Sequence, residues 1–398
     1  DGGLEAWLVI LGSWLIMFAS NGYIQSFGVY QAYYDQILGK SSSAISWIGS
    51  FQLWLLYGGA TIVGRVFDDG WGKVLILGGS LLYVICVFTI SLCKEYWQVF
   101  LAQGLGLGLS LATLTLPALA VIPHWFSARR ALATGVAVSG SCVGELSSRV
   151  FMLNNLIASH GFAYAVRATG YLILGCLAVA CFLIKFRIPA RKHRASHMQL
   201  PPPDIGAIMR HKTYWVATAG VFLITWGIFF PIFYLQASRC HPQLAFYLIS
   251  ILSGASVIGS IVPNFLADKF GPYNSLMATS LCAAILVFVF PLVGSTGGSI
   301  AFAVLYGFFS ATYSSLIPAI STSLSVHLGE IGVRMGIAWT VYSLAALSGP
   351  PICGALLGNG PFNWWRPVAF SGTSLVAGSA LLFVARTMLA KTKGSAMV

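Results

Sequence analysis

Two oppositely charged residues, Glu145 and Arg149, lie four positions apart inside an apolar stretch, "GSCVGELSSRVFM" at 140–152. On a helix, positions i and i+4 share one face, and a glutamate that precedes an arginine is the favourable order. Each charge would cost about 2.5–3.5 kcal/mol at the centre of a membrane helix. The carboxylate could carry a proton and the guanidinium could hold an anion. Alternatively, Arg149 extends outward and Glu145 is its structural counter-ion.

The surrounding polar residues favour a position on a partner helix or a watery path. Polar side chains recur on one side of the predicted helix, whereas the other side is aliphatic. The polar side comprises Thr134, Ser141, Glu145, Ser148 and Arg149, and the aliphatic side Val136, Val143, Val150 and Leu153. A one-sided polar stripe in a membrane helix does not face lipid.

Composition predicts the elements that must position this pair. Of 398 residues, 57% are hydrophobic and 8% are charged, against roughly 25% charged in soluble domains. Apolar runs of about 20 residues, the length that crosses a bilayer, recur about twelve times. They are 6–30, 44–66, 74–93, 96–121, 131–152, 164–186, 214–237, 245–267, 274–294, 298–324, 334–356 and 366–388. Barrel strands are half as long and alternate, so the predicted fold is all-α and integral to a membrane.

A basic, proline-containing stretch divides these runs into six and six. We therefore predict a first bundle over 1–187, a flexible cytoplasmic linker over 188–212 and a second bundle over 213–398. Two short repeats support a duplication. "DGWGK" (69–73) matches "DKFGP" (268–272) at an offset of 199, and "RRALA" (129–133) matches "RMGIA" (334–338) at about 204. Duplicated halves around a central site are a transporter architecture.

The net charge of +12 does not require a nucleic acid. Lys and Arg concentrate on one side of the predicted spans, which is the positive-inside pattern. Both termini are then expected in the cytoplasm. The plasma membrane is the expected location, with an organelle membrane as the alternative. The eight cysteines form no CxxC pair, and no His/Cys spacing suggests a metal, so no metal or cofactor is expected.

Several motifs together resemble the major facilitator superfamily and, within it, the fungal branch of the monocarboxylate-porter family. They are "DGGLEAWLVILGSW" (1–14), "NGYIQSFGVYQAYY" (21–34), "GRVFDDGWGK" (64–73), "HWFSARRALATGVAVSGSCVG" (124–144), "FLADKFGPYNSL" (265–276) and "RMGIAWTVYSLAALSGPPICGALL" (334–357). The resemblance implies two six-helix bundles that rock about a central site. It also implies a gating role for loop charges that hold one conformer closed: Arg65, Asp68, Asp69, Lys73, Arg130, Asp268 and Arg334. The alternative is that these residues end helices or set topology.

The departures from the family pattern bear on substrate. Where relatives carry a lysine and an eighth-helix arginine or aspartate, this chain has Gln25, Ser260 and Ser256. A monocarboxylate substrate is therefore not expected, and the charge of the fifth helix is what distinguishes this member. Further candidates for the substrate path are Ser141, Asn21, Tyr234, Tyr306, Tyr313 and Tyr342, although a membrane tyrosine is often a packing residue.

We expect a monomeric secondary transporter of a small organic solute, with an organic anion among the candidates. Proton symport is implied by the resemblance, and Glu145 is the membrane-embedded acid that would serve it. A transport-dead nutrient receptor of the same fold is the alternative. An intramembrane enzyme is not expected, because neither HExxH nor GxSxG occurs in the sequence.

Overall fold

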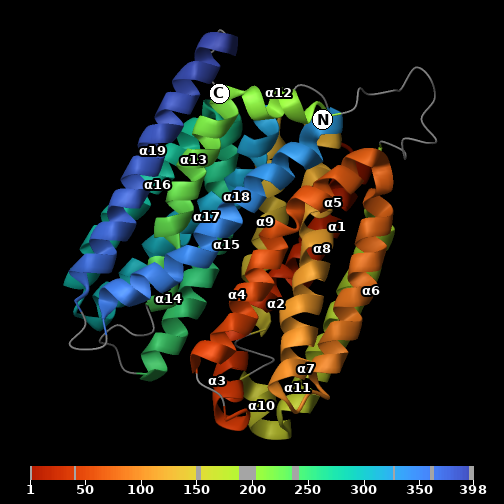
Figure 1. Cartoon of the computed structure of the whole chain (residues 1–398), viewed down its shortest axis with the longest axis vertical. Helices are drawn as coiled ribbons and strands as arrows, with labels where there is room; N and C mark the ends of the chain where they lie inside the picture. Colours follow the sequence, from red (N-terminus) through yellow and green to blue (C-terminus); the bar gives the residue numbers. More distant parts are fainter. Residues whose placement is uncertain are drawn as a thin grey trace. The chain divides into compact units, whose positions relative to one another are not determined.

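The computed structural model describes residues 2–39, 42–148, 154–187, 203–234, 242–325, 328–358 and 363–393. Every regular element within these ranges is a helix, as the hydropathy predicts (Figure 1). Ten continuous helical stretches in the described part are long and apolar enough to cross a membrane. One of them, Ala44–Ile90, has 47 residues and holds two of the predicted spans. The predicted span 131–152 corresponds to α9 (Arg130–Leu146).

The described chain divides into two compact units. Unit 1 comprises Asp1–Ala128, Val136–Pro203 and Ser325–Thr340; unit 2 comprises Arg129–Gly135, Asp204–Leu324 and Val341–Val398. Two helices therefore change unit along their length. Helix α9 begins in unit 2 and continues in unit 1, and α18 (Ile331–Leu357) begins in unit 1 and continues in unit 2.

Unit 1 is built mainly from the helices of the first 187 residues. They are α1 (Leu4–Ala19), α2 (Asn21–Gln25), α3 (Phe27–Ile37), α4 (Ser42–Gly58), α5 (Ala60–Val66), η1 (Phe67–Trp71), α6 (Gly72–Ile90), α7 (Tyr96–Val99), η2 (Phe100–Leu107), α8 (Gly108–Ala120), η3 (Ile122–His124), α10 (Asn154–His160) and α11 (Phe162–Leu183), together with η9 (Leu328–Glu330). The predicted first span is thus broken at Ser20 and Ser26. Helix α1 packs on α11, and α8 packs on both α4 and α6.

Unit 2 contains α12 (Ile205–Arg210), α13 (Lys212–Ile228), α14 (Phe230–Tyr234), α15 (Pro242–Phe270), α16 (Pro272–Val289), η8 (Phe290–Leu292), α17 (Thr296–Ser323) and α19 (Trp365–Lys393). Helix α12 corrects one expectation, because it lies in the stretch predicted to be a flexible linker. Its start is fixed by Asp204, whose carboxylate accepts a hydrogen bond from the N–H of Ala207 at 3.0 Å; such an N-cap stabilises a first turn.

The helix pairings of unit 1 recur in unit 2. The pairs α1·α11, α4·α8, α6·α8 and α6·α11 correspond in chain order to α13·α19, α15·α17, α16·α17 and α16·α19. Glycines permit the closest approaches, as at Gly220 and Gly378 between α13 and α19, where a methyl group on Gly378 would lie 2.6 Å from the carbonyl oxygen of Gly220. The duplication inferred from short sequence repeats is therefore visible in the packing.

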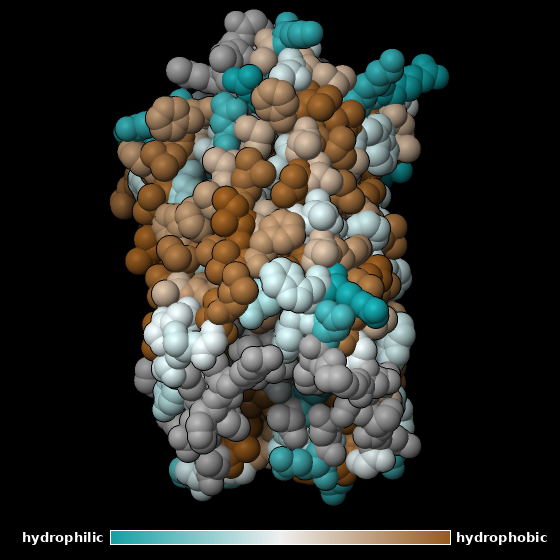
Figure 2. All heavy atoms as spheres, turned by 90° about the vertical axis from the view of Figure 1, so that its left-hand side faces the viewer, coloured by the Kyte–Doolittle hydropathy of each residue, from teal (hydrophilic) through white to brown (hydrophobic). Residues whose placement is uncertain are grey.

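Many large apolar side chains remain on the surface. In unit 2, Phe265, Ile285 and Phe383 are exposed, and hydrophobic residues dominate the face drawn in Figure 2, with hydrophilic residues mainly toward its upper and lower margins. A soluble protein rarely exposes so large an apolar surface, whereas hydrocarbon tails solvate it well.

Candidate functional site: two carboxylates at helix starts

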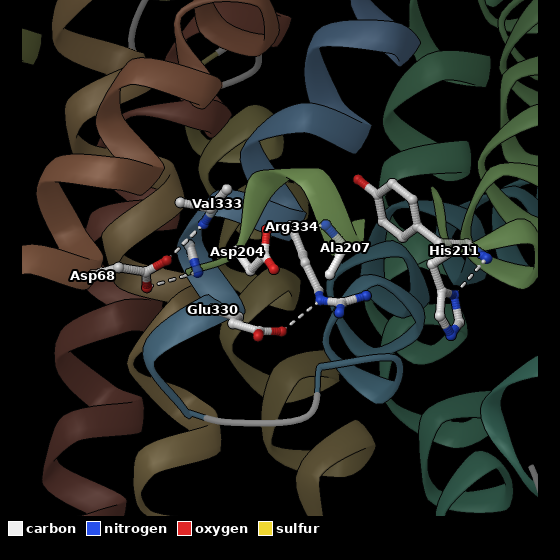
Figure 3. A network of polar contacts seen from close by, with 9 residues as sticks. Asp68, Asp204, Ala207, His211, Glu330, Val333 and Arg334 are labelled. Carbon is white, nitrogen blue, oxygen red and sulfur yellow. Dashed lines mark hydrogen bonds and ion pairs between the residues drawn. The ribbon is translucent and has the colours of Figure 1, made fainter. Parts of the chain in front are cut away.

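Asp68 caps the start of α18 within unit 1. Its carboxylate accepts hydrogen bonds from the backbone N–H groups of Gly332 at 2.9 Å and Val333 at 2.7 Å (Figure 3). The side chain is 7% exposed. The first N–H groups of a helix have no partner in the helix itself and carry the positive end of its dipole. A buried carboxylate at this place therefore satisfies two donors and gains electrostatic stabilisation.

Asp268 does the same within unit 2. It lies in the last turn of α15, and its carboxylate accepts hydrogen bonds from the N–H groups of Ala131 at 2.8 Å and Leu132 at 2.9 Å. These are in the first turn of α9, so both helices that change unit have an aspartate at their start. Asp268 is only half-buried, so its hydrogen bonds compete more with water than those of Asp68.

The contacts correct the register of the internal repeat. The sequence matches pair Asp69 with Asp268 and Arg129 or Arg130 with Arg334. In the structure, however, Asp68 and Asp268 are the equivalent caps, 200 positions apart, and the capped turns begin at Gly332 and Ala131, 201 positions apart. Between Asp68 and Gly72 the chain has one residue more than between Asp268 and Gly271, and this stretch contains the kink at Gly70. Asp69 therefore aligns by motif but does not cap.

Glycines let the capped helices approach their partners closely. A methyl group on Gly64 would lie 2.0 Å from the carbonyl oxygen of Gly332, and one on Gly336 would lie 2.4 Å from that of Ala60. In unit 2, a methyl group on Gly135 would lie 2.2 Å from the carbonyl oxygen of Ser260. Gly135 and Gly336 are again 201 positions apart. Sequence analysis missed these glycines, although their common offset could have revealed them.

The basic residues near the caps have separate partners. Arg334 is 3% exposed and donates from Nε to the Glu330 carboxylate at 2.9 Å, one turn earlier (Figure 3). Glu330 was not a candidate in the sequence. In unit 2, Arg130 donates to Thr322 at 3.1 Å. Burial lowers the pKa of the Arg130 guanidinium, and the charge of Asp268 opposes that shift.

Arg65 and Lys73 are exposed. Between them, η1 turns the chain from α5 into α6, and Gly70 has φ of 91° there. An L side chain would be strained at that φ, so the glycine is needed to place Asp68 directly before the turn. The structure does not bring Arg65 and Lys73 to the capped turn of α18 through any hydrogen bond or ion pair found among the described residues.

Glu145 lies near the end of the described part of α9 and is half-buried. Arg149 lies outside the described residues. Next to Glu145, Gly144 packs against α1, where a methyl group would lie 2.2 Å from the carbonyl oxygen of Phe18, and Gly140 does so against that of Trp14 at 2.4 Å. These two glycines therefore let α9 approach α1 closely. Ser141 is buried and donates to the carbonyl of Val138 at 2.7 Å.

The other first-half candidates differ in exposure. Asn21 donates to the Thr115 hydroxyl at 2.8 Å, which joins α2 to α8 inside unit 1. Gln25 is exposed. The structure places both on α2, one turn apart.

The second-half candidates are mostly buried, and several of their hydroxyls form hydrogen bonds between helices of unit 2. Tyr306 donates to the carbonyl of Ile228 at 2.6 Å, and Ser256 donates to that of Gly307 at 3.1 Å. Tyr313 and Thr225 share a hydrogen bond of 2.5 Å. Ser260 donates to the carbonyl of Ser256 within α15. Tyr342 is 4% exposed; Tyr234 ends α14, and its side chain is outside the described part.

Comparison with known proteins identifies the class. The sequence profile of the Major Facilitator Superfamily matches residues 7–350. The chain is 37% identical to the aspyridones efflux protein of Emericella nidulans, covering 100% of this chain and 81% of that protein. It is 33% identical to the fujikurins efflux protein of Gibberella fujikuroi, covering 98% and 84%.

The chain belongs to the Major Facilitator Superfamily. Proteins of this superfamily are membrane transporters rather than enzymes, and they carry small solutes. Solved members share the fold at low sequence identity. The E. coli fucose:proton symporter is 15% identical with a TM-score of 0.70, covering 96% of this chain and 97% of that one. The human organic anion transporter MFSD10 is 16% identical with a TM-score of 0.69, covering 96% and 99%.

The motifs also led us to expect a narrower family, the monocarboxylate porters. The relatives with the names quoted above are fungal efflux proteins, and their names contain no monocarboxylate. These relatives support membership of the superfamily and a transporter function.

Proposed function

We propose that this major facilitator protein exports a small organic metabolite by alternating access. Two relatives that cover the chain almost completely are named for the efflux of organic compounds, which supports both the direction and the class of solute. The resemblance to the fungal branch of the monocarboxylate-porter family describes ancestry in this proposal, not substrate. The exporter works as a monomer in the plasma membrane with both termini in the cytoplasm.

The observation that carries the mechanism is the pair of carboxylate caps. Asp68 belongs to the predicted first half, whereas Gly332 and Val333 belong to the predicted second half. For the other cap the halves are reversed: Asp268 belongs to the predicted second half, and the N–H groups of Ala131 and Leu132 belong to the predicted first half. Each cap is favourable only while the helix start is at its carboxylate. Interactions made in one conformer and not in another set the balance between them, so the two caps act as latches of one conformer.

Glu145 supplies proton coupling in this proposal. It is the acid of the apolar stretch 131–152, and the stripe of Thr134, Ser141 and Ser148 supplies polar neighbours along the same helix. Arg149 balances the Glu145 carboxylate or holds a substrate anion. Asn21, Gln25, Ser256, Ser260 and the tyrosines 234, 306, 313 and 342 complete the solute path.

The test is transport by the purified full chain in proteoliposomes. A panel of organic acids, sugars, amino acids and apolar metabolites is first screened for thermal stabilisation of the protein, and the hits are then followed as labelled solutes with and without a pH gradient. We expect saturable movement of at least one hit that accelerates when protons run in the opposite direction. Binding without any movement across the bilayer would instead establish the receptor function.

A further inference from the structure

A groove of about 490 Å³ opens on the surface of unit 1 where α6 ends and α7 begins. We call it the α6–α7 groove. Cys86, Thr89 and Cys93 line it from the side of α6, and Trp97, Gln98 and Ala102 line it from α7 and η2. Its volume lies within the range of roughly 300–1,000 Å³ that small-molecule sites occupy. The proposed export mechanism uses none of these residues.

The floor of the groove is formed by a close approach of α6 to η2. A methyl group on Gly106 would lie 2.4 Å from the sulfur of Cys86, so the two helices nearly touch there. Toward the surface the groove is lined by the aliphatic Leu92 and Leu101, which are exposed at 67% and 48%. An apolar molecule in the groove would therefore rest on a closed floor between two apolar walls.

The depth of the groove in the bilayer follows from its mouth. The turn between α6 and α7 carries the exposed charges Lys94 and Glu95, which belong at the level of the lipid headgroups. Trp97 is 57% exposed, and exposed tryptophans gather at that interface. The groove extends from Cys93, in the turn after α6, to Cys86, one helical turn before the end of α6 at Ile90, and so reaches down into the hydrocarbon.

The polar atoms of the groove leave one donor and one acceptor open. Gln98 uses its carbonyl oxygen to accept from the N–H groups of Lys94 at 2.9 Å and Glu95 at 3.3 Å, so its amide NH₂ remains as a donor. The Thr89 hydroxyl donates to the carbonyl of Ile85 at 2.8 Å, so its lone pairs remain as an acceptor. The Trp97 N–H already donates to Glu95.

A single hydroxyl group on a ligand matches the Gln98 donor and the Thr89 acceptor, because it accepts one hydrogen bond and donates another. None of the described side chains that line the groove is charged, so nothing in the lining pairs with a phosphate or an ammonium group. The fitting ligand is an amphiphile with an apolar body and one hydroxyl at the headgroup level.

We propose that the α6–α7 groove binds a membrane sterol. The sterol hydroxyl accepts from the Gln98 amide and donates to the Thr89 oxygen, and the rigid ring system lies along the groove over Cys86 and Ala102. The surrounding membrane supplies the ligand, so the site is filled from the side and not through the solute path.

The test uses the full chain in phosphatidylcholine vesicles with a photoreactive sterol that carries its diazirine on the tail. We expect photolabelled peptides from residues 86–102, with labelling removed by an excess of sterol but not by its 3-methyl ether, which cannot donate. Thr89→Val keeps the side-chain shape and removes the acceptor. It should weaken sterol binding about three- to tenfold, the effect of one hydrogen bond.

The matched control is Thr113→Val, because Thr113 lines a different groove between α6 and α8; its sterol affinity should be unchanged. Sterol should also slow the maleimide labelling of Cys93, which sits at the mouth. Ala102→Phe fills the groove and should abolish photolabelling if the variant folds. Equal competition by the methyl ether, labelling spread over other surfaces, or a Thr89→Val affinity equal to wild type would each overturn the proposal.

Discussion

Asp68 and Asp268, 200 positions apart, each accept two backbone hydrogen bonds at the first turn of a helix, Asp68 at α18 and Asp268 at α9. Both helices change unit along their length. Because a helix start attracts negative charge, the two carboxylates are natural places at which to weaken one conformer without touching the solute path.

Asp68→Asn should destabilise the described conformer. The amide keeps one acceptor but loses the charge, and hydrogen bonds to charged groups are worth about 1.5–3 kcal/mol. We expect a lower midpoint of thermal unfolding for the purified protein and a changed transport rate. Asp69→Asn is the control, since it removes a charge at the adjacent position without removing a cap. Equal effects of the two variants would show that the cap geometry is irrelevant.

Asp268→Asn should have a smaller effect than Asp68→Asn, because Asp268 is half-buried and its hydrogen bonds compete with water. The double variant tests whether the two caps are coupled. Independent sites add within about 0.3–0.5 kcal/mol, so a larger deviation measured by denaturant unfolding would show that the caps stabilise the same transition. Asp204→Asn, which affects only the cap of α12, serves as the comparison.

Gly64→Ala should be severely destabilising. The added methyl group would lie 2.0 Å from the carbonyl oxygen of Gly332, a distance at which backbone must move, and overpacking costs about 1–3 kcal/mol or more. Gly78→Ala is the matched control on α6, because a methyl group there has no neighbour within 4 Å. The measurement is the yield of monodisperse protein after size-exclusion chromatography. A normal yield for Gly64→Ala would contradict the close packing.

The buried pair of Glu330 and Arg334 predicts a particular pattern of stability. Removing one partner of a buried ion pair leaves a charge without its counter-ion and costs about 3–5 kcal/mol, whereas replacing both costs far less. Arg334→Met should therefore lower the free energy of unfolding more than the double change Glu330→Gln with Arg334→Met. A double variant less stable than Arg334→Met would contradict this, because it would show that Glu330 without Arg334 is not a costly uncompensated charge.

Glu145→Gln should abolish pH-dependent transport while leaving folded protein in the membrane, because the amide cannot carry a proton. Glu5→Gln is the control: it removes an acid whose exposed ion pair with Lys185 is 2.7 Å long. Proton-driven transport by Glu145→Gln at the wild-type rate would exclude Glu145 as the coupling group.

The sequence predicts the helices well because a long apolar run identifies a segment that lies in the membrane. It does not predict the breaks within them. Ser20 and Ser26 interrupt the first span, the chain kinks at Gly70 within η1, and η2 is π-helical. Hydropathy does not register such local irregularities. Helix α12 was missed for the opposite reason: it is only six residues long, too short for periodicity to identify it.

The gating residues were predicted as a group, but their roles were not. Asp68 and Asp69 are adjacent acids, and no local pattern says which one caps a helix more than 260 positions later. The one extra residue between Asp68 and Gly72 decides it, because it shifts the repeat register by one residue. The offset shared by Gly135 and Gly336 was available in the sequence, although only the close backbone contacts give it meaning. The roles of Glu145 and the tyrosines remain predictions.

Helices α9 and α18 each begin in one unit and continue in the other. This arrangement limits how the polypeptide can be cut into stable fragments. A protease that cuts between residues 188 and 202 would release two fragments. The first would lack residues 325–340 of unit 1, and the second would lack residues 129–135 of unit 2. Neither fragment could complete its own compact body, so severed pieces should accumulate only when they are synthesised together.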